Sequence, residues 1–518
     1  MGGQGATSIA ATPPRPVIVP APLPGFAFRD LPGRIRANGA ARPDAPALIE
    51  GDAVTSWGDL AGAMDRIAAH LSARGVAPGD AVASLGGVTA DHVALYLGVL
   101  AAGACMAPLP TSARPETIAA MIANCAPALI FADASGAEAA ADVASDPLDG
   151  LIGRTAGLRP GPPRVPAEDD AFDIIYSSGT TGSPKGIVHD HLFRARQAVR
   201  FASYGFDAAI SLVSTPIYSN TTLAALLPAL AGGGTIVLMD RFDAGRFLAL
   251  AERHRVTHAM LVPVQYRRIL DHPGFDAADL SSFRVKLSTS APFPAPMLRE
   301  ALSRWPGRMV NMYGMTEGGV GCMLDAGAHP GKLHTVGRPV AGCELRILDG
   351  DGRAGPPGAF GEVVGRSATM MTGYLGDPER TRAALWRSPE GEAFVRSGDV
   401  GRIDEDGFLV LMDRAKDMVN SGGFNVFPAD LEAVLSAHPL VAEVAVIAVP
   451  SAEWGETPLA LVVPRGPADP ETLRGWANAR LGRTQRIAAV ELREALPRSE
   501  IGKVLKRELR APYWPDRP

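Results

Sequence analysis

The segment that most constrains the fold of this chain is residues 174–186, Ile-Ile-Tyr-Ser-Ser-Gly-Thr-Thr-Gly-Ser-Pro-Lys-Gly. An apolar run of the kind that forms a buried strand leads into a loop of glycines and small hydroxylated residues that ends in one lysine. Hydroxyl groups can donate hydrogen bonds, glycines let backbone N–H groups approach a ligand closely, and the lysine adds a positive charge. The segment therefore predicts a polyphosphate-binding loop, whose residues are Ser177, Ser178, Gly179, Thr180, Thr181, Gly182 and Lys185.

This loop does not follow the Walker pattern, in which Gly-x-x-x-x-Gly-Lys is followed by Ser or Thr. Pro184 precedes the lysine here and Gly186 follows it. A different nucleotide-binding fold is therefore predicted. The alternative interpretation is a polar surface turn, so the prediction depends on support from other parts of the chain.

Further segments supply that support, because together with the loop they resemble the AMP-forming acyl-activating enzymes. This family includes acyl-CoA synthetases, peptide-synthetase adenylation domains and firefly luciferases. The matching segments follow the family's order, from its phosphate loop through its Tyr-Gly-x-Thr-Glu motif and its ribose-binding and hinge region to its C-terminal catalytic lysine. They are residues 177–186, 313–317, 397–399, 413–417, 421–424 and 502–503.

The length and charge of the chain limit the classes of protein to consider. At 518 residues it exceeds the roughly 250 to 300 at which single cores stop growing, so we expect two or more domains. The net charge is −5 and no block of like charges occurs, which indicates a small-molecule substrate and no nucleic acid. The longest apolar stretch, residues 93–109, is shorter than the roughly 20 residues that span a bilayer, so we expect no stable membrane insertion.

Two further features bear on the compartment. The four cysteines contain no Cys-x-x-Cys pair and are sparse for a disulfide framework, which favours a reducing compartment. Residues 1–26 are rich in Ala, Pro and Gly and lack the pattern of a secretory signal, so we expect a flexible leader. We predict a cytoplasmic protein, and a homodimer is an open alternative.

Helical and strand-like segments alternate through most of the chain, which predicts an α/β fold with parallel sheets. The predicted helices cover residues 57–74, 92–101 and 244–254, and the predicted strands cover 81–85, 128–131, 234–239 and 259–262.

The pattern changes near residue 400. Residues 400–403 and 408–411 flank an Asp-Glu-Asp-Gly turn and predict a hairpin. Predicted elements at 428–437 (helix), 441–449 and 459–463 (strands) and 470–481 (helix) then suffice for a small α+β domain. With the hinge that the resemblance implies, the predicted units are a leader at 1–26, a large N-terminal domain of sheets flanked by helices at 27–412, a hinge at 413–416 and a mobile C-terminal lid at 417–518.

The resemblance implies that a carboxylate is joined to the α-phosphate of ATP and that pyrophosphate is released. A carboxylic acid with a pKa near ~4 is already ionised at pH 7, so the site must align two anions and neutralise charge. By resemblance, Lys503 binds the carboxylate and the α-phosphate, and Thr316 donates to the α-phosphate. Glu317 holds Mg²⁺, and Lys185 contacts the β- and γ-phosphates.

The resemblance also places the nucleoside. Asp399 can accept hydrogen bonds from the ribose hydroxyls, Arg414 can donate to the same sugar, and Tyr313 offers an aromatic face to adenine. Ala291 and Pro292 resemble the family's adenine-contacting strip, which usually carries a glycine where Thr289 or Ser290 stands. The remaining ATP contacts that the resemblance implies are Asn311, Met312 and Gly314.

The second implied reaction is attack of the thiol of CoA on the acyl-adenylate, with release of AMP. In the family, a loop matching Gly422, Gly423 and Phe424 lines the CoA tunnel after the lid rotates about a hinge that aligns with Lys416. Glycines permit the close approach of a ligand chain.

The predicted acid-binding pocket is roomy and mainly apolar. Tyr218 and Ser219 fall where many acyl-CoA synthetases carry an aromatic residue followed by histidine, and the serine leaves space. Gly318 and Gly319, near Gly314, lower the side-chain bulk, although they could equally serve backbone geometry alone. These features favour an aromatic, alicyclic or medium-to-long acyl acid.

Several alternatives stay open or are disfavoured. The runner-up is an acyl-AMP ligase that passes the acyl group to a separate carrier protein, or a stand-alone adenylation enzyme. A luciferase-like oxidation is less favoured. Residues 215–223 contain no aspartate to hold an amino group, which disfavours an amino-acid substrate. His254 and His258 stand four apart, but the His-Glu-x-x-His motif is incomplete, which disfavours a zinc hydrolase. A non-catalytic nucleotide-binding protein would lack Lys503 or Glu317.

Overall fold

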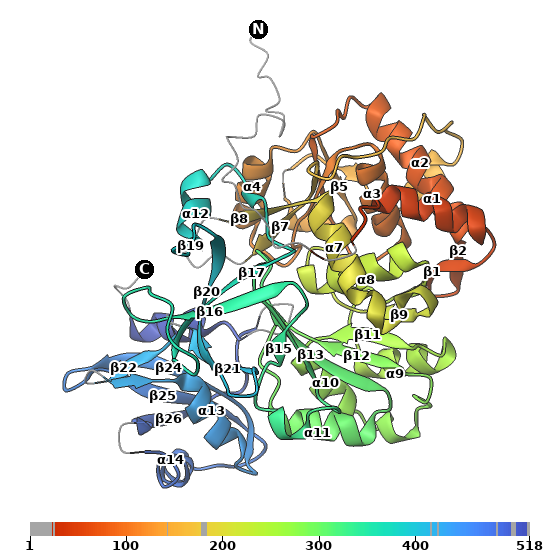
Figure 1. Ribbon diagram of the computed structural model, residues 1–518. Helices are drawn as coiled ribbons and strands as arrows, with labels where there is room; N and C mark the ends of the chain where they lie inside the picture. The colour runs from red at the N-terminus through yellow and green to blue at the C-terminus, as the bar shows by residue number, and fades with distance from the viewer. Residues whose placement is uncertain are drawn as a thin grey trace.

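The computed structural model describes Leu23 and residues 26–141, 143–177, 184–414, 417–421, 424–482, 485–498 and 504–514. At positions 177, 413, 414, 420, 424 and 425 it describes the backbone alone. Within these residues the strands form four sheets. Figure 1 shows the C-terminal part, in blue, as a smaller unit beside one large body.

The nine-stranded sheet of the large body has the order β15-β14-β13-β12-β11-β9-β10-β1-β2. Its strands from β13 to β1 run parallel, as the alternation of helices and strands predicts, and the edge strands β2, β14 and β15 are antiparallel. The strands are β1 (Pro46–Glu50), β2 (Ala53–Ser56), β9 (Ile210–Val213), β10 (Thr235–Leu238), β11 (His258–Leu261), β12 (Val285–Ser288), β13 (Arg308–Gly314), β14 (Gly321–Asp325) and β15 (Arg338–Pro339). The connecting helices are α8 (Asn220–Gly232), α9 (Ala244–Arg253), α10 (Pro263–Leu270) and α11 (Ala295–Arg304).

The seven-stranded sheet has the order β18-β8-β7-β4-β3-β5-β6. Strands β3 to β7 are parallel to their neighbours, and β8 and β18 add an antiparallel edge. The strands are β3 (Ala81–Leu85), β4 (Cys105–Pro108), β5 (Leu129–Ala132), β6 (Asp146–Pro147), β7 (Ala171–Ser177), β8 (Lys185–Asp190) and β18 (Gly373–Tyr374). The helices of this region are α1 (Leu31–Ala41), α2 (Trp57–Ala73), α3 (Ala90–Ala101), α4 (Pro115–Cys125), α5 (Ala134–Ala139), α6 (Leu151–Thr155), α7 (His191–Phe201) and α12 (Pro378–Ala383).

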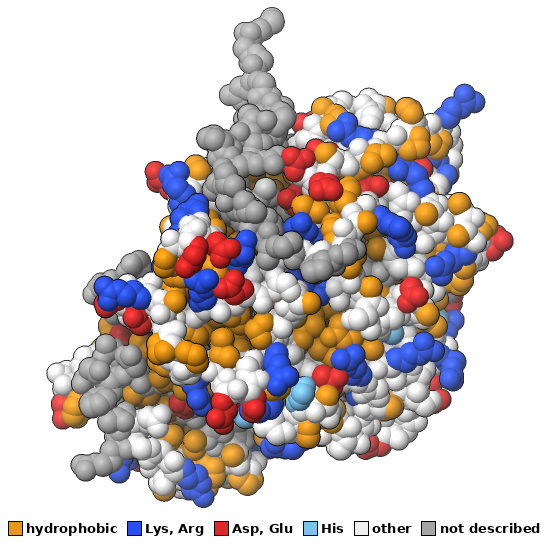
Figure 2. Space-filling view, in the orientation of Figure 1, with side chains coloured by type: hydrophobic (Ala, Val, Ile, Leu, Met, Phe, Trp, Pro, Cys, Tyr) orange, Lys and Arg blue, Asp and Glu red, His pale blue; other side chains and the backbone are white. Residues whose placement is uncertain are grey.

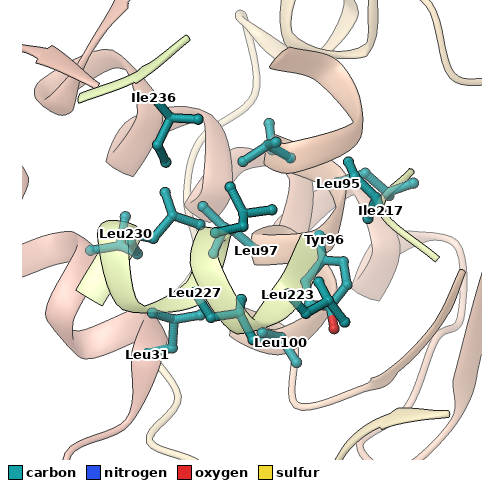
Figure 3. Packing of buried hydrophobic residues seen from close by; sticks show 14 of the residues in the cluster. Leu31, Leu95, Tyr96, Leu97, Leu100, Ile217, Leu223, Leu227, Leu230 and Ile236 are labelled. Carbon is teal, nitrogen blue, oxygen red and sulfur yellow. The ribbon is translucent and has the colours of Figure 1, made fainter. Parts of the chain in front are cut away.

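One core joins the two sheets. A cluster of buried apolar residues takes side chains from strands of both sheets and from helices α2, α3 and α8. Figure 3 shows Leu223, Leu227 and Leu230 of α8 packed near Leu97 and Leu100 of α3. Helices that are apolar on every side are buried on every side, and almost all residues of α3 and α8 are buried.

Side chains at the helix starts explain where several helices begin. The Ser56 hydroxyl accepts from Asp59 N at the start of α2, and the Thr89 hydroxyl accepts from His92 N at the start of α3. The Asp190 carboxylate accepts from Phe193 N at the start of α7. Such caps satisfy backbone N–H groups that have no partner in the first helical turn.

A third, antiparallel sheet has the order β16-β17-β20-β19, with β21 paired to β20. Its strands are β16 (Cys343–Leu348), β17 (Gly361–Ser367), β19 (Leu385–Arg387), β20 (Ala393–Ile403) and β21 (Leu409–Arg414). The predicted hairpin near residue 400 is the pair β20–β21. The Asp404 carboxylate closes its turn by accepting from Asp406 N and Phe408 N.

The C-terminal part has a core of its own, formed by residues 419–492. Its sheet has the order β23-β22-β25-β24, with β26 parallel to β25. The elements are β22 (Val419–Ser421), β23 (Phe424–Val426), α13 (Pro428–Ser436), β24 (Val441–Ser451), β25 (Gly455–Pro464), α14 (Pro470–Asn478), β26 (Ala489–Leu492) and α15 (Lys506–Arg510).

The predicted elements agree with the observed ones except at some ends. The predicted strand at 459–463 is longer, as β25 begins at Gly455, and the predicted helix at 470–481 is shorter, as α14 ends at Asn478. Ends are the weakest part of a pattern-based prediction because local contacts extend or fray them. The predicted hinge residue Lys416 and the leader at 1–26, apart from Leu23 and Phe26, lie outside the described residues.

The surface shows no large field of one charge on the face seen in Figure 2, where basic and acidic side chains are interspersed. No helix among the described residues has the length and apolar character needed to cross a membrane.

Candidate active site

The carboxyl ends of parallel strands bring the predicted site segments to one edge of the nine-stranded sheet. Residues 214–219 follow β9, residues 289–292 follow β12, and residues 315–319 follow β13. Ligands bind at such edges in open α/β sheets. The acid-pocket, adenine and Thr-Glu segments are far apart in the sequence but share this edge.

Tyr313 and Asp399 meet at the predicted nucleoside position. The Tyr313 hydroxyl donates to Asp399 Oδ2 at 2.5 Å, although the two residues lie 86 positions apart. Burial, together with the charge of Asp399, raises the pKa of the Tyr313 hydroxyl well above its ordinary value, so the group stays protonated and donates. Asp399 also faces Arg414 in the β20–β21 ladder.

The adenine strip after β12 lies beside β13. The ladder pairs Ser288 with Asn311, so Ala291 and Pro292 follow a strand end next to Asn311 and Met312. Asn311 Oδ1 is buried and has no hydrogen-bond partner within the described part of the chain. An unpaired buried acceptor costs about 1–3 kcal/mol, which a donor on a ligand would recover.

Glu317 lies where β13 turns away from the sheet. Its side chain is 9% exposed, and its Oε1 accepts a hydrogen bond from the Tyr374 hydroxyl at 2.8 Å. Burial and the Glu317 charge raise the pKa of Tyr374 well above its ordinary value. A hard carboxylate oxygen fits Mg²⁺, which usually takes one or two protein carboxylates and completes its shell with phosphate and water oxygens.

Lys185 lies over the ring of the same tyrosine. Its Nζ lies 5.5 Å from the centroid of the Tyr374 ring, whose hydroxyl reaches Glu317. A cavity of about 220 Å³ opens beside this group and is lined by residues that include Asn124, Lys185, Tyr374 and Arg380. The positive charges of Lys185 and Arg380 make this cavity suitable for binding phosphate oxygens.

Ser290 occupies the position where the resemblance expects a glycine. Its φ is +76°, a left-handed conformation that costs a residue with a Cβ roughly 1–2 kcal/mol. Its hydroxyl lies 2.5 Å from that of Thr221, near the start of α8. The strip therefore keeps the backbone shape of a glycine while carrying a polar side chain.

Gly318 and Gly319 have a role in backbone geometry, which is one of the two interpretations that the sequence left open. Their φ angles are +71° and +78°, a region that favours glycine. A Cβ on Gly318 would lie 2.3 Å from the Thr369 carbonyl oxygen, and one on Gly319 would lie 2.6 Å from the Gly365 carbonyl oxygen. Protein backbone fills the space that the missing side chains leave.

Tyr218 and Ser219 stand at the start of α8. The buried Ser219 hydroxyl caps this helix by accepting from Thr221 N at 3.2 Å. The Tyr218 hydroxyl oxygen is buried and has no partner in the described ranges. Ser219 thus has a structural reason for its small polar side chain in addition to the space it leaves.

Two protein-family models match this chain. The AMP-binding enzyme family matches residues 35–375, well over half of the chain, and the AMP-binding enzyme C-terminal domain matches residues 430–503. The chain belongs to the AMP-binding enzyme family. Membership confirms the predicted α/β fold and the predicted ATP-dependent activation of a carboxylic acid, with ATP, Mg²⁺ and CoA as the family's cosubstrates and cofactor.

Several relatives of this chain match it over nearly its full length. A feruloyl-CoA synthase of Amycolatopsis is 35% identical over 90% of this chain and 96% of its own. A fatty acid–[acyl-carrier-protein] ligase of Streptomyces coeruleorubidus is 30% identical over 92% of this chain and 94% of its own. The ATP-bound MatB crystal structure from Rhodopseudomonas palustris superposes with a TM-score of 0.84 at 28% identity, covering 93% of this chain and 98% of that one.

Part of the predicted site of this AMP-binding enzyme lies outside the described residues. This holds for Ser178, Gly179, Thr180, Thr181 and Gly182 of the phosphate loop, for Lys416, Gly422 and Gly423, and for Lys503. The side chains of Ser177, Arg414 and Phe424 are also not described. The roles predicted for these residues stay predictions.

The structure adds residues near the site that the sequence did not single out. Tyr374 contacts Glu317 from a strand 57 positions away, so no local pattern could have indicated it. Asp173 is different, because it interrupts the apolar run of β7 with a charged group. A charged residue within an apolar run is a signal that sequence reasoning could have used.

The two histidines four residues apart do not form a metal site. Both ring nitrogens of His258 have protein partners, with Nδ1 at 2.7 Å from Thr257 Oγ1 and Nε2 at 2.7 Å from the Tyr204 carbonyl oxygen. The described residues contain no group of three or more His, Cys, Asp or Glu that could hold a metal ion.

Proposed function

We propose that this enzyme converts a bulky apolar carboxylic acid to its CoA thioester through an acyl-adenylate. In the first step, a carboxylate oxygen bonds to the α-phosphorus of ATP and pyrophosphate leaves. In the second step, the sulfur of CoA bonds to the acyl carbon, AMP leaves with the electron pair of the broken bond, and the thiol proton is released. The acid is aromatic, alicyclic or a medium-to-long acyl chain.

The observation that carries the choice of an apolar acid is the lack of charge along the strand ends that border the site. Residues 214–223 after β9 and residues 287–293 after β12 contain no Asp, Glu, Lys or Arg. Residues 312–320 contain Glu317 alone. A second carboxylate or an ammonium group on the acid would be buried there without a counter-ion, which is costly. Both dicarboxylic and amino acids are therefore disfavoured.

The relatives support an aromatic acid and keep one alternative in view. A relative at 35% identity is named for feruloyl-CoA, the thioester of an aromatic acid. Another at 30% identity is named for loading fatty acids on an acyl-carrier protein. A separate carrier protein is thus the second candidate acceptor for the acyl group.

The proposed roles follow the kinds of groups present. Mg²⁺, when bound, would neutralise charge on the phosphates, and Glu317 would hold it. Thr316 would donate to the α-phosphate, Lys185 would bind the β- and γ-phosphates, and Lys503 would bridge the acid and the α-phosphate. Aligning two mutually repelling anions in this way supplies most of the catalysis that such a step needs.

The second step is proposed to follow a rotation of the C-terminal part. Residues 417–518 would turn about the hinge at 413–416, with Lys416 taking up the change, and bring Gly422, Gly423 and Phe424 to the CoA chain. The separate core of residues 419–492 supports movement as a unit. The cytoplasmic location stays a prediction from the sequence, and a homodimer stays an open alternative.

The test is pyrophosphate release from ATP and Mg²⁺ with benzoic, cinnamic, cyclohexane-carboxylic, fatty, dicarboxylic and amino acids, each with and without CoA. We expect release with one apolar class and formation of its CoA thioester. Release without a thioester would favour the carrier-protein alternative. Selective release with a dicarboxylic or amino acid would refute the argument from uncharged strand ends.

Two variants separate the steps. Lys503→Ala should nearly abolish adenylate formation and spare thiolysis of supplied acyl-adenylate, whereas Gly423→Leu should block thioester formation first. Lys506→Ala is the matched control, because Lys506 forms a surface ion pair with Glu432. Equal loss of both steps in Lys503→Ala would contradict the role of Lys503.

A further inference from the structure

A cluster of charged side chains is buried next to the catalytic segments. Asp173 on β7, His189 on β8 and Arg194 on α7 have side chains no more than 2% exposed. His189 Nδ1 lies 2.7 Å from Asp173 Oδ1, and Arg194 Nη2 lies 2.7 Å from Asp173 Oδ2. The Tyr96 hydroxyl donates to Asp173 Oδ2 at 2.6 Å.

His189 connects this cluster to the backbone of Thr316. Its Nε2 lies 2.8 Å from the Thr316 carbonyl oxygen, across 127 positions of sequence. A carbonyl oxygen can only accept, so Nε2 carries a proton and donates it to this hydrogen bond. The Phe193 ring stacks on the imidazole, with centroids 4.1 Å apart and planes 25° from parallel, which fixes the plane of the ring.

The other end of the cluster reaches the helix that borders the acid pocket. Arg194 Nη1 donates to Asn220 Oδ1 at 2.7 Å, and Asn220 is the first residue of α8. The same Nη1 donates to Gln197 Oε1 at 2.8 Å. The cluster therefore ties the Thr316 turn to two strands, β7 and β8, and to three helices, α3, α7 and α8.

Stability alone does not account for these charges. Replacing a buried ion pair by apolar residues of similar volume is often neutral or stabilising, by about 1–4 kcal/mol. Burial by itself would raise the pKa of the Asp173 carboxyl, but Arg194 and His189 lower it below its ordinary value. The carboxylate thus stays charged in the core, where it holds both partners in fixed orientations.

We propose that His189 is a positioning residue that holds the Thr316–Glu317 turn in its reactive geometry, with Asp173 and Arg194 orienting the imidazole. The hydrogen bond to the Thr316 carbonyl oxygen fixes the backbone from which the Thr316 hydroxyl and the Glu317 carboxylate project. This inference rests on the proposed roles of Thr316 and Glu317 in the adenylation step.

Two substitutions of His189 separate positioning from structure. A glutamine amide can place its nitrogen near the position of Nε2 and keep the bond to Thr316, whereas an asparagine amide replaces Nδ1 and keeps the contact with Asp173. We expect His189→Asn to lower the kcat of pyrophosphate release roughly 10- to 100-fold, and His189→Gln to stay within roughly threefold of the wild type. The thermal midpoints of the two variants should be similar.

The matched control is His92, another buried histidine, whose Nδ1 lies 2.8 Å from the Gly87 carbonyl oxygen and whose Nε2 lies 2.7 Å from Ser84 Oγ. His92→Asn should lower the thermal midpoint and leave the kcat of the folded enzyme unchanged. Equal rates for His189→Asn and His189→Gln, or rates that only follow their thermal midpoints, would overturn the positioning role. Pyrophosphate release by the wild type tests the proposed function separately. The ratio of the kcat of His189→Gln to that of His189→Asn tests the positioning role of His189.

Discussion

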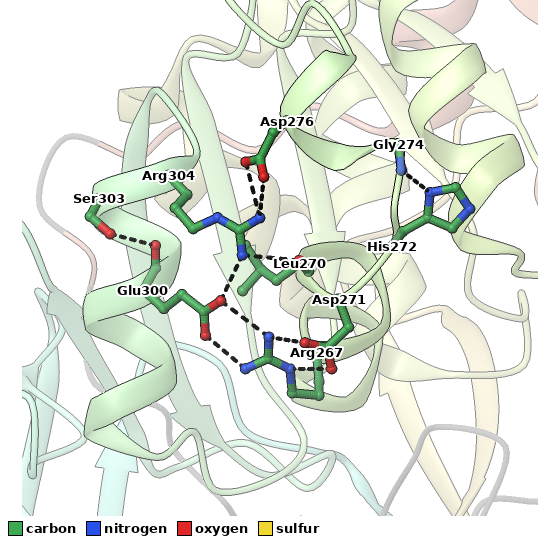
Figure 4. Close-up of polar contacts among 9 residues, drawn as sticks. All are labelled: Arg267, Leu270, Asp271, His272, Gly274, Asp276, Glu300, Ser303 and Arg304. Carbon is green, nitrogen blue, oxygen red and sulfur yellow. Dashed lines mark hydrogen bonds and ion pairs between the residues drawn. The ribbon is translucent and has the colours of Figure 1, made fainter.

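Two networks of arginines and carboxylates in this protein have the same chemistry and different surroundings. In one, Asp173, His189 and Arg194 are almost fully buried beside the Thr316–Glu317 turn. In the other, shown in Figure 4, Glu300 accepts from both Arg267 and Arg304 at 2.7 Å, and each arginine also binds an aspartate. The arginines of the second network are 30–33% exposed, and its carboxylates are 31–78% exposed.

The difference teaches that exposure to water, and not the number of ion pairs, sets what a network contributes. Water and salt screen the surface network, so each pair in it contributes about 0–1 kcal/mol. In the buried network, removing one partner leaves an uncompensated charge in a medium of low dielectric constant. The surface network can therefore tolerate change, whereas the buried one constrains the geometry of every group it touches.

The largest expected effect comes from breaking the buried network. Asp173→Ala leaves Arg194 without its carboxylate, so we expect the free energy of unfolding to fall by about 3–5 kcal/mol, measured by urea unfolding of the N-terminal body. Asp173→Asn keeps hydrogen-bonding groups and should lose less. A loss below about 1 kcal/mol for the alanine variant would place this network in the same class as exposed pairs.

Lys286 sharpens the comparison, because it is a buried basic side chain with no carboxylate partner among the residues that the structure describes. It is fully buried on β12, and its Nζ contacts the Trp305 carbonyl oxygen near the end of α11. Burial lowers the pKa of Lys286 from 10.5 to about 7. Between these values the unfolded chain holds the proton and the folded chain does not, so the stability contributed by this residue rises with pH.

Comparing the wild type with Lys286→Met over this pH range tests whether the free energy of unfolding rises with pH because of Lys286. Relative to the variant, the wild type should gain up to about 1.4 kcal/mol of unfolding free energy per pH unit between pH 7 and 10. Urea unfolding at several pH values measures the difference. A parallel pH dependence in both proteins would show that Lys286 does not titrate in this window.

Tyr374 and Glu317 form an intermediate case, since this carboxylate is buried and is proposed to hold Mg²⁺. Tyr374→Phe removes the hydrogen bond to Glu317 Oε1. Losing such an orienting bond should raise the Mg²⁺ concentration needed for half-maximal pyrophosphate release roughly tenfold, with a smaller change in unfolding free energy. Tyr313→Phe, which removes the bond to Asp399, is the matched control and should change the KM for ATP more than the Mg²⁺ requirement.

The smallest expected effect comes from the surface network. Glu300→Gln should lower the free energy of unfolding by about 0–1 kcal/mol, and less in high salt. Hydrogen bonds from Arg267 lower the pKa of Glu300, so its contribution is present above its ordinary pKa and is lost as pH falls through the lowered value. A loss as large as that of Asp173→Ala in the same assay would contradict the role assigned to exposure.

The sequence by itself determined the α/β fold and the family, and it supplied the predicted chemistry of the site. Motifs such as residues 174–186 and 313–317 carry that information because a phosphate or a metal needs particular groups within a few residues of each other. The alternation of helices and strands also predicted where β3, β10 and β11 lie, since periodicity is a local property.

Only the tertiary structure decided what depends on distant contacts or on backbone angles. The positive φ angles of Ser290, Gly318 and Gly319 cannot be read from composition, and they bear on the interpretation of the acid pocket. The contacts of Tyr374 with Glu317 and of His189 with Thr316 join residues 57 and 127 positions apart. Such pairs leave no local pattern, because the packing of several elements sets which side chains meet and local propensity does not.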